Sequence, residues 1–327
     1  MRFSVLLPIL IVLLQLVARV ALAQTETKLV QVQTFEGETE EYSVLATDKK
    51  VRQGPYVRYR AASINGLVVY EAGSYDHGLK EGEWSQFAKE RPWNSLLSKG
   101  SFHNGMPEGL WTYYHYKHLS GGPFNRAGTP IAQATANGPG PKAGYSVNIA
   151  DTAAVVQAQG LYARGVRVGM WVYYDRKGQV TQKIDHFSNQ LIYWRPETGV
   201  PISGGAAATH PVMYLGGKSR LTDEIWQLLN YALLIRSNDN NDDGVVEVAF
   251  AIDTAGQPAS VSLVGAEKPT RYQKLMLATL SKVPPNWLPQ AKDGKAVAGE
   301  YKVRITTTAK KVGERTQLMT TVDALGD

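Results

Sequence analysis

One pattern of glycine and aromatic residues occurs three times between Gly73 and Tyr174, and its internal spacing never changes. Each copy follows Gly-x-aromatic-x-x-Gly-x-x-x-Gly-x-Trp-x-x-aromatic, and the second and third copies begin at Gly100 and Gly160. A half-copy that matches the second half of the pattern begins at Gly54. Because a single β-hairpin does not bury its own face, we expect the copies to stack into an elongated sheet whose neighbouring hairpins share a core.

The repeated residues have predicted roles in such a sheet. The two glycines that lie four residues apart in each copy are expected at the positive-φ positions of hairpin turns, and aromatic side chains are expected to stack between neighbouring hairpins. Trp84, Trp111 and Trp171 recur at one fixed offset, as packing requires, so we predict that they are core residues. An aromatic row that contacts carbohydrate or lipid is the alternative.

The spacing of the copies also divides the chain. The last interval between half-copy glycines is 60 residues against 27 for the interval before it, which indicates an insertion of 33 residues. Residues near 119–150, rich in Gly, Pro, Ala and Asn, supply it, and we predict a flexible loop there. The predicted order is an N-terminal segment at 24–53, hairpin repeats at 54–194, a linker at 195–210 and a second domain at 211–327.

Residues 1–23 have the pattern of a cleavable secretory signal peptide. Met1 and Arg2 precede an apolar stretch at 3–18, and Ala21-Leu22-Ala23 places small residues three and one before Gln24. We therefore expect an exported protein, periplasmic or in the outer envelope. Retention of the segment as an inner-membrane anchor is the alternative, and membrane association is expected only in that case. The chain has no cysteine, which does not conflict with an oxidising compartment, because two sizeable cores need no disulfides.

The charge of the chain argues against nucleic acid as a partner. Thirty-five Lys and Arg residues stand against 29 Asp and Glu residues, for a formal charge of +6. Removal of Arg2 and Arg19 with the signal would leave about +4. The basic residues are scattered and form no stripe of the kind that phosphate backbones require.

The repeats resemble the MORN-type repeat family, particularly its bacterial variant, over about residues 54–194. That resemblance implies an interaction or scaffold module rather than a catalytic one.

The hundred or so residues after Pro211 have a different pattern. Leu221, Ile225, Leu228 and Leu229 form a helical face, with Asp223 and Glu224 expected in the first turn, where the helix dipole favours them. Alternating residues predict strands at 246–252, 259–264 and 301–306, and a capping box of Thr270 and Gln273 opens a second helix. The predicted fold class is thus mainly β plus α+β: a stacked hairpin sheet followed by a two-helix, three-stranded antiparallel domain.

Three motifs in this region resemble the TonB C-terminal domain family, over about residues 211–308. They are Pro211 with Gly216-Gly217, the strand and turn Gly244-x-Val246-x-Val248-x-Phe250-x-Ile252-Asp253-x-x-Gly256, and Pro285-x-Trp287-x-Pro289. The resemblance implies a domain that recognises an extended segment of an outer-membrane receptor by adding a strand to its sheet.

The same resemblance implies which strand receives the partner. The last strand, about residues 300–308, is the implied edge, and Tyr301, Val303 and Ile305 are the implied partner-binding residues. Residues 317–322 have a strand-like composition of their own, so the alternative is that this tail covers the edge.

The chain also departs from the TonB pattern. The Tyr-Pro that usually ends the first helix is Tyr231-Ala232 here, and a long proline-rich spacer is missing. The chain shows no cysteine nucleophile, Gly-x-Ser-x-Gly elbow, His-Glu-x-x-His motif or phosphate-binding glycine loop, so we expect a non-enzyme without a cofactor. The expected function is a periplasmic binding protein that supports TonB-type transmembrane transport through protein partners. A homodimer, a membrane-anchored energy transducer and a structural envelope scaffold are the alternatives.

Two groups of residues are weak candidates for a metal site. His103, His115 and His118 lie near Glu108, but none recurs at the equivalent place in the other copies. Residues 239–244 fit the first half of a calcium loop, yet its twelfth position is Phe250 rather than a bidentate Glu. We therefore predict no metal.

Overall fold

The computed structural model divides the chain into two compact units, residues 1–154 with 161–166 and residues 155–160 with 167–327. No helix among the described residues is long and apolar enough to cross a membrane. The predicted signal peptide lies outside the described residues, which are 26–35, 37–62, 66–88, 95–115, 134–135, 146–147, 154–196, 200–203, 209–234, 244–265, 268–312 and 315–325.

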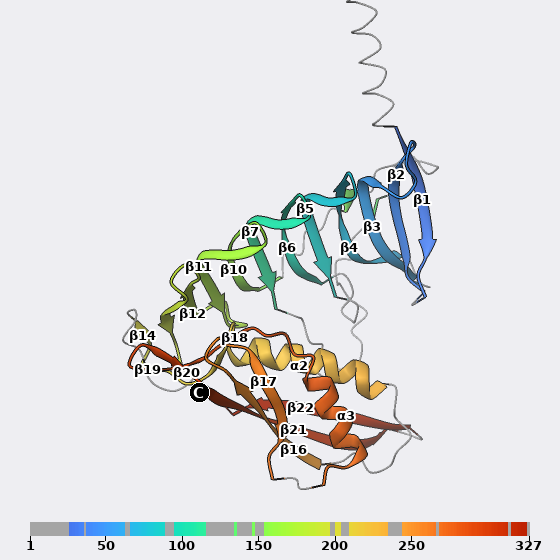
Figure 1. The fold of residues 1–327 in the computed structure, drawn as a ribbon. Helices are drawn as coiled ribbons and strands as arrows, with labels where there is room; N and C mark the ends of the chain where they lie inside the picture. Colours follow the sequence, from blue (N-terminus) through green and yellow to red (C-terminus); the bar gives the residue numbers. More distant parts are fainter. Residues whose placement is uncertain are drawn as a thin grey trace, which may run out of the picture. The chain divides into compact units, whose positions relative to one another are not determined.

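Hairpin strands follow one another in chain order, as the repeats predict (Figure 1). The first seven strands pair antiparallel, each of the first six with the strand that follows it. They are β1 (Thr27–Gln33), β2 (Thr39–Leu45), β3 (Arg52–Ala62), β4 (Gly66–Asp76), β5 (Leu79–Phe87), β6 (Leu96–His103) and β7 (Met106–Tyr114). The predicted N-terminal segment at 24–53 therefore contributes two sheet strands, which the repeat pattern did not indicate.

The later hairpins continue the series. They are β10 (Val156–Ala163), β11 (Val166–Tyr174), β12 (Val180–Asp185), β13 (Gln190–Trp194) and β14 (Ile202–Ser203). The pairing of β14 with β13 corrects the prediction for 195–210, because part of that linker is a sheet strand. Within the predicted loop at 119–150, the described residues form a two-residue ladder between β8 (Ala134–Thr135) and β9 (Ser146–Val147).

The hairpin turns depend on glycine where the sequence predicts it. His77-Gly78 and Asn104-Gly105 have positive φ at both positions, the requirement of two-residue type I′ turns. Each turn is also tied to the hairpin before it: the amide of Gly78 donates to the Arg52 carbonyl at 2.8 Å, and that of Gly105 to the Lys80 carbonyl at 2.9 Å.

The first glycine of each copy has a packing role that the sequence did not predict. Gly73 is not a turn residue: it lies within β4, where an added β-carbon would be 2.2 Å from the Trp84 ring. A β-carbon added at Gly100 would lie 2.2 Å from the Trp111 ring, and one added at Gly160 would lie 2.3 Å from the Trp171 ring. These glycines leave room for the tryptophan ring to lie flat on the neighbouring strand.

The predicted core role of the tryptophans is confirmed. The exposed fractions of Trp84, Trp111 and Trp171 are 1%, 5% and 0%. Other side chains of the first unit form a separate apolar cluster: Val57, Tyr59, Val69, Phe87 and Leu96.

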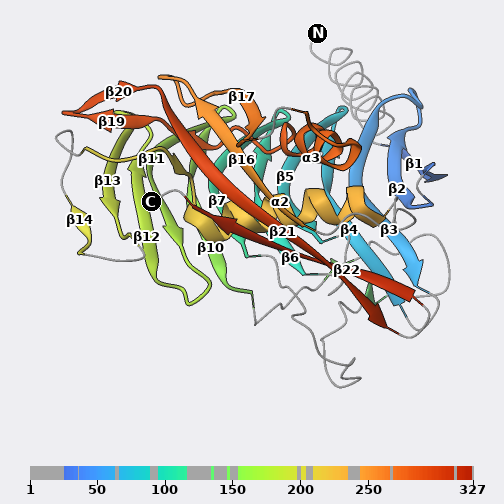
Figure 2. The ribbon, with the colours of Figure 1, turned by 90° about the horizontal axis from the view of Figure 1, so that it is seen from below.

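The chain from residue 211 onward forms a four-stranded antiparallel sheet with two helices, in which β21 and β22 are the longest strands (Figures 1 and 2). The strand order is β17-β16-β21-β22, one strand more than the predicted three, because the tail forms β22. Its elements are α2 (Gly217–Leu234), β16 (Gly244–Ile252), β17 (Pro258–Leu263), α3 (Arg271–Leu280), β21 (Gly299–Val312) and β22 (Arg315–Ala324). Two short ladders complete it, β15 (Met213–Tyr214) with β18 (Trp287–Leu288) and β19 (Gln290–Lys292) with β20 (Lys295–Val297).

Both helices contribute to one core on one face of this sheet. Leu221, Ile225 and Leu229 of α2 and Met276 and Leu280 of α3 share a cluster with the inward residues of the strands. The capping box of Thr270 and Gln273 is confirmed. The first-turn prediction for Asp223 and Glu224 is wrong, because α2 begins at Gly217 and places them in its second turn.

Candidate functional site

The three predicted partner-binding residues are core residues. Tyr301, Val303 and Ile305 have exposed fractions of 1%, 0% and 0%. Their strand pairs with β16 along one side and, from Val303 onward, with β22 along the other. Val303 and Ile305 therefore offer a partner neither a side chain nor a free edge, and the side chain of Tyr301 is buried as well. The structure thus has the arrangement given above as the alternative, in which the tail pairs with this strand.

The four-stranded sheet of the second unit has two outer strands, β17 and β22, and they differ in length and composition. β17 has six residues and begins at Pro258, which lacks an amide donor. β22 has ten residues, no proline and charged residues only near its ends, at Arg315 and Asp323. Natural edge strands are usually short, charged or interrupted by proline, so β22 is the less protected edge.

The pairing of β22 with β21 indicates which amides of β22 point away from β21. The amide of Leu325 donates to the Lys302 carbonyl at 2.8 Å, so the Leu325 main chain faces β21. Main-chain groups alternate in direction along an antiparallel strand, so Thr321 and Asp323 also face β21. Thr320 and Val322 therefore direct their amides and carbonyls toward the outer side, where the described part of the chain places no further strand.

An aromatic ladder crosses the hairpins of the first unit. Neighbouring ring centroids lie 5.1 to 6.5 Å apart, mostly edge to face. The ladder consists of Tyr42, Tyr56, Tyr75, Trp84, Phe102, Trp111 and Tyr162.

Basic side chains lie over this ladder at one repeat position. The Arg52 guanidinium is 4.3 Å from the ring centre of Tyr42, and the Lys80 ammonium is 3.9 Å from that of Trp84. Both residues stand two places before a half-copy glycine. Arg167, at the same position, lies 4.8 Å from the ring centre of Trp171 in the second unit. This recurrence is visible in the sequence once the contact is known, and sequence reasoning missed it.

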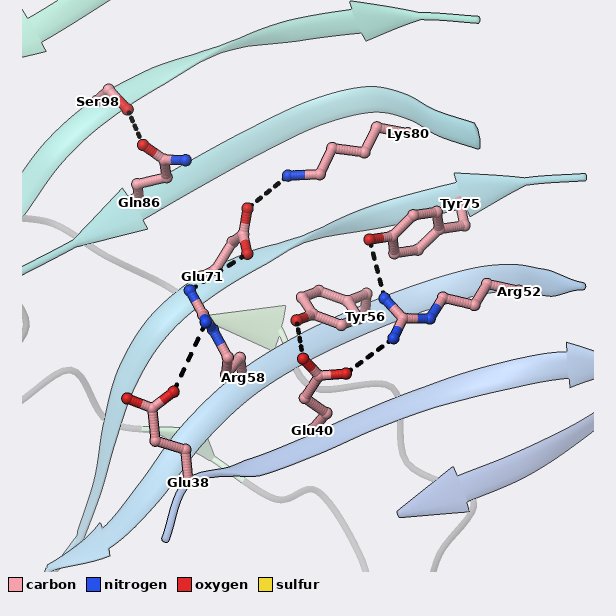
Figure 3. Close-up of polar contacts among 10 residues, drawn as sticks. All are labelled: Glu38, Glu40, Arg52, Tyr56, Arg58, Glu71, Tyr75, Lys80, Gln86 and Ser98. Carbon is pink, nitrogen blue, oxygen red and sulfur yellow. Dashed lines mark hydrogen bonds and ion pairs between the residues drawn. The ribbon is translucent and has the colours of Figure 1, made fainter. Parts of the chain in front are cut away.

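A chain of alternating charges, whose two carboxylates are buried and whose basic side chains are partly exposed, flanks the ladder (Figure 3). Arg58 lies between Glu38 and Glu71, 3.6 Å from each, and the Lys80 ammonium lies 2.5 Å from Glu71. Both carboxylates are buried, at 3% and 9% exposure. Buried carboxylates need such partners, so these ion pairs favour the observed register of β3, β4 and β5.

A second group of polar contacts lies beside it (Figure 3). Arg52 donates to Glu40 at 2.8 Å and to the Tyr75 hydroxyl at 3.1 Å, and the Tyr56 hydroxyl donates to Glu40 at 3.2 Å. Burial, together with the Glu40 charge, raises the pKa of Tyr56 well above its usual range, so this phenol stays a hydrogen-bond donor. On the next strands, Ser98 donates to Gln86 at 3.1 Å.

The histidine group considered for metal binding has another arrangement. A nitrogen of His103 lies 3.0 Å from Glu81, which raises the pKa of His103, and the other Glu81 oxygen accepts from the amide of Asn104. Glu108, at the position equivalent to Glu81, accepts from the amide of Arg164 at 2.7 Å. Both glutamates therefore hold the turn of the next hairpin. Among the described residues, no group of three His, Asp or Glu is placed to hold a metal. His118 and the 239–243 segment lie outside them.

Polar residues at the start of α2 connect it to the hairpins of its own unit. Gln182 of β12 donates to the Tyr214 carbonyl at 3.1 Å and accepts from the amide of Gly216 at 2.8 Å. Asp223 pairs with Arg176. Asp223 therefore contacts the β11–β12 turn of the second unit instead of the helix dipole.

Glu224 of α2 accepts hydrogen bonds from two side chains. It accepts from the hydroxyl of Tyr214 and, at 2.8 Å, from Arg220. Arg220 is buried, so Glu224 supplies the charge that keeps this guanidinium inside the fold. The sequence pattern singled out Glu224 for the helix dipole but did not indicate its contacts with Tyr214 and Arg220.

Comparison of the sequence with protein-family models, with curated proteins and with solved structures found no match in any of the three. The MORN and TonB resemblances therefore remain predictions.

Proposed function

We propose that this chain is an exported, non-enzymatic binding protein whose C-terminal sheet takes up an extended segment of a protein partner along the outer edge of β22. The observation that carries the proposal is the ten-residue edge itself, without proline and with outward-facing amides at Thr320 and Val322. Strand addition uses such main-chain groups for affinity and neighbouring side chains for selectivity.

The hairpin repeats act in this proposal as a rigid scaffold that carries the binding domain and offers a second surface to partners. The tryptophans and the ion pairs around Glu71 support that role, because they fix the strands to one another. The role in TonB-type transmembrane transport rests on the resemblance of the 211–308 region, with an outer-membrane receptor segment as the proposed partner.

The proposal is tested by removing one outward amide of β22. Proline is tolerated on an edge strand where its missing donor faces outward, so Thr320→Pro should leave the β21–β22 ladder intact while deleting one bond to an added strand. Thr320→Val keeps the amide and is the matched control. Full-length variants are used to capture proteins from an envelope extract, and the captured partner's extended segment, made as a synthetic peptide, is then titrated by calorimetry.

We expect Thr320→Pro to weaken peptide binding by about tenfold or more, since it removes a main-chain hydrogen bond and places a ring against the partner. Thr320→Val should bind within about twofold of the unchanged chain. Equal binding by both variants would place the partner elsewhere. Sedimentation of the purified protein separates the homodimer alternative: if a second copy occupies the edge, Thr320→Pro converts a dimer to a monomer.

A further inference from the structure

β1 leaves one edge of the hairpin sheet open. It pairs with β2 along one side, and the described part of the chain places no strand along its other side (Figure 1). The strand has seven residues, no proline and a single charged side chain, that of Lys28. Natural edge strands are usually short, charged or interrupted by proline, so the composition of β1 gives its open edge little protection.

Hydrogen bonds at both ends of β1 indicate which of its main-chain groups point outward. The carbonyl of Glu26 accepts from the amide of Ala46 at 2.8 Å. The amide of Thr34 donates to the carbonyl of Glu38 at 2.7 Å. Because main-chain groups alternate in direction along an antiparallel strand, the residues of β1 at even positions face β2. The outward amides and carbonyls therefore belong to Thr27, Leu29, Gln31 and Gln33.

Apolar side chains of β1 are uncovered as well. Leu29 and Val32 have exposed fractions of 46% and 43%. Side chains alternate between the two faces of a sheet, so these two residues lie on opposite faces. The edge thus presents the main-chain groups that strand pairing joins and the apolar surface that a neighbouring strand covers.

The outward main-chain groups are arranged symmetrically about Val30. A second copy that pairs antiparallel with β1 about this residue places Thr27 opposite Gln33 of the other copy. It likewise places Leu29 opposite Gln31. Both pairs join outward-facing groups, so about eight main-chain hydrogen bonds form between the two copies.

The same register suits the side chains. Lys28 lies opposite Val32 of the second copy, so its aliphatic part covers an exposed valine and no like charges oppose each other. Val30 lies opposite Val30 of the second copy. Because Val30 also pairs with Tyr42, the first ring of the aromatic ladder, the two valines join the ladders of the two copies on one face.

We propose that two copies of this chain associate through their β1 strands, antiparallel about Val30, so that their hairpin sheets form one continuous sheet. The occupant of the edge is a second copy because its own β1 satisfies every outward main-chain group, reduces the exposure of both apolar side chains and opposes no like charges. The contact lies in the first unit and does not depend on strand addition at β22.

Single cysteines test the register, because the natural chain has none. The two Val30 residues form a non-hydrogen-bonded pair with Cα atoms about 4.5 Å apart, which is within the range of a disulfide. Val30→Cys should therefore give a covalent dimer under mild oxidation, measured by non-reducing electrophoresis. Val32→Cys, on the same face, is the matched control. Its two copies lie about 14 Å apart, so they should stay unlinked.

Sedimentation of the purified full-length protein over a range of concentrations measures the association itself. Leu29→Pro removes an outward amide and leaves the ladder between β1 and β2 in place, since proline is tolerated where its missing donor faces outward. Leu29→Ile keeps both the amide and an apolar side chain, and thermal unfolding checks that every variant is folded. We expect Leu29→Pro to raise the dissociation constant of the dimer by about tenfold or more, and Leu29→Ile to change it by less than about twofold.

A monomer at every concentration overturns the proposal, as does equal crosslinking of the two cysteine variants. A dimer that Thr320→Pro dissociates and Leu29→Pro does not would place the second copy at β22, and it overturns the proposal as well. Crosslinking by Val30→Cys alone, together with a dimer that Leu29→Pro weakens, establishes β1 as the contact between copies.

Discussion

Replacing Gly73 by alanine tests how the repeat sheet is packed. The new β-carbon would lie 2.2 Å from Cδ2 and 2.3 Å from Cε2 of Trp84. Carbon atoms in ordinary contact are about 3.5 Å apart, so the ring would have to move by about 1.3 Å. Trp84 has little freedom to do so, because Tyr75 and Phe102 pack against it and its indole nitrogen donates to the Ser74 carbonyl at 3.1 Å.

The expected cost follows from these contacts. Overpacking of a buried site costs about 1–3 kcal/mol, and a weakened hydrogen bond adds about 1 kcal/mol. We therefore expect Gly73→Ala to lower the free energy of unfolding of the first unit by about 3 kcal/mol. Gly82→Ala is the matched control: no atom lies within 4 Å of its added β-carbon, and its φ of 68° alone should cost about 1–2 kcal/mol.

Hydrogen exchange followed by mass spectrometry measures both effects, because peptides from β4 to β6 report the local opening free energy. A double-mutant cycle places Gly73→Ala in a Trp84→Ala background. The clash is absent there, so most of the free-energy cost of Gly73→Ala should vanish. The packing account is refuted if Gly73→Ala costs no more than Gly82→Ala, or if its cost survives the removal of Trp84.

Two further perturbations act on the second unit. Glu224→Ala should lower its free energy of unfolding by about 3–5 kcal/mol, because it leaves the buried Arg220 without its carboxylate; denaturant unfolding would show a much smaller loss for the exposed control Glu300→Ala. Burial beside Trp171, with Arg167 nearby, lowers the pKa of His186 to about 4. The unfolded chain then takes up this proton first, so stability should be full above about pH 6.5 and fall between there and pH 4. Thermal unfolding against pH should show a smaller decline for His186→Gln, and parallel curves would contradict this.

The hairpin array could be predicted from the sequence because its pattern is local. Trp84 repeats at a fixed distance from two glycines, and that spacing indicates both the hairpin and its buried face. The role of Gly73 could not be separated from that of Gly78 in the same way, since a turn and a close approach both select glycine. β1 was missed because it lacks the motif and its residues are mostly exposed.

The second unit shows where local pattern is insufficient. The composition of residues 317–322 predicts a strand, but only the long-range pairing of β22 with β21 decides which edge remains free. The alternating pattern places Tyr301 in a strand correctly. It does not indicate that the Tyr301 side chain is buried, so the sequence predicts a partner contact there.

Amide hydrogen exchange along β22, measured by NMR with and without the partner segment, tests strand addition most directly. Thr321 and Asp323 already face β21, so their exchange should change little on binding, while the amides of Thr320 and Val322 become protected. Protection that alternates in this way would establish β22 as the receiving edge. Unchanged exchange at Thr320 and Val322 in a saturated complex would contradict the proposed function.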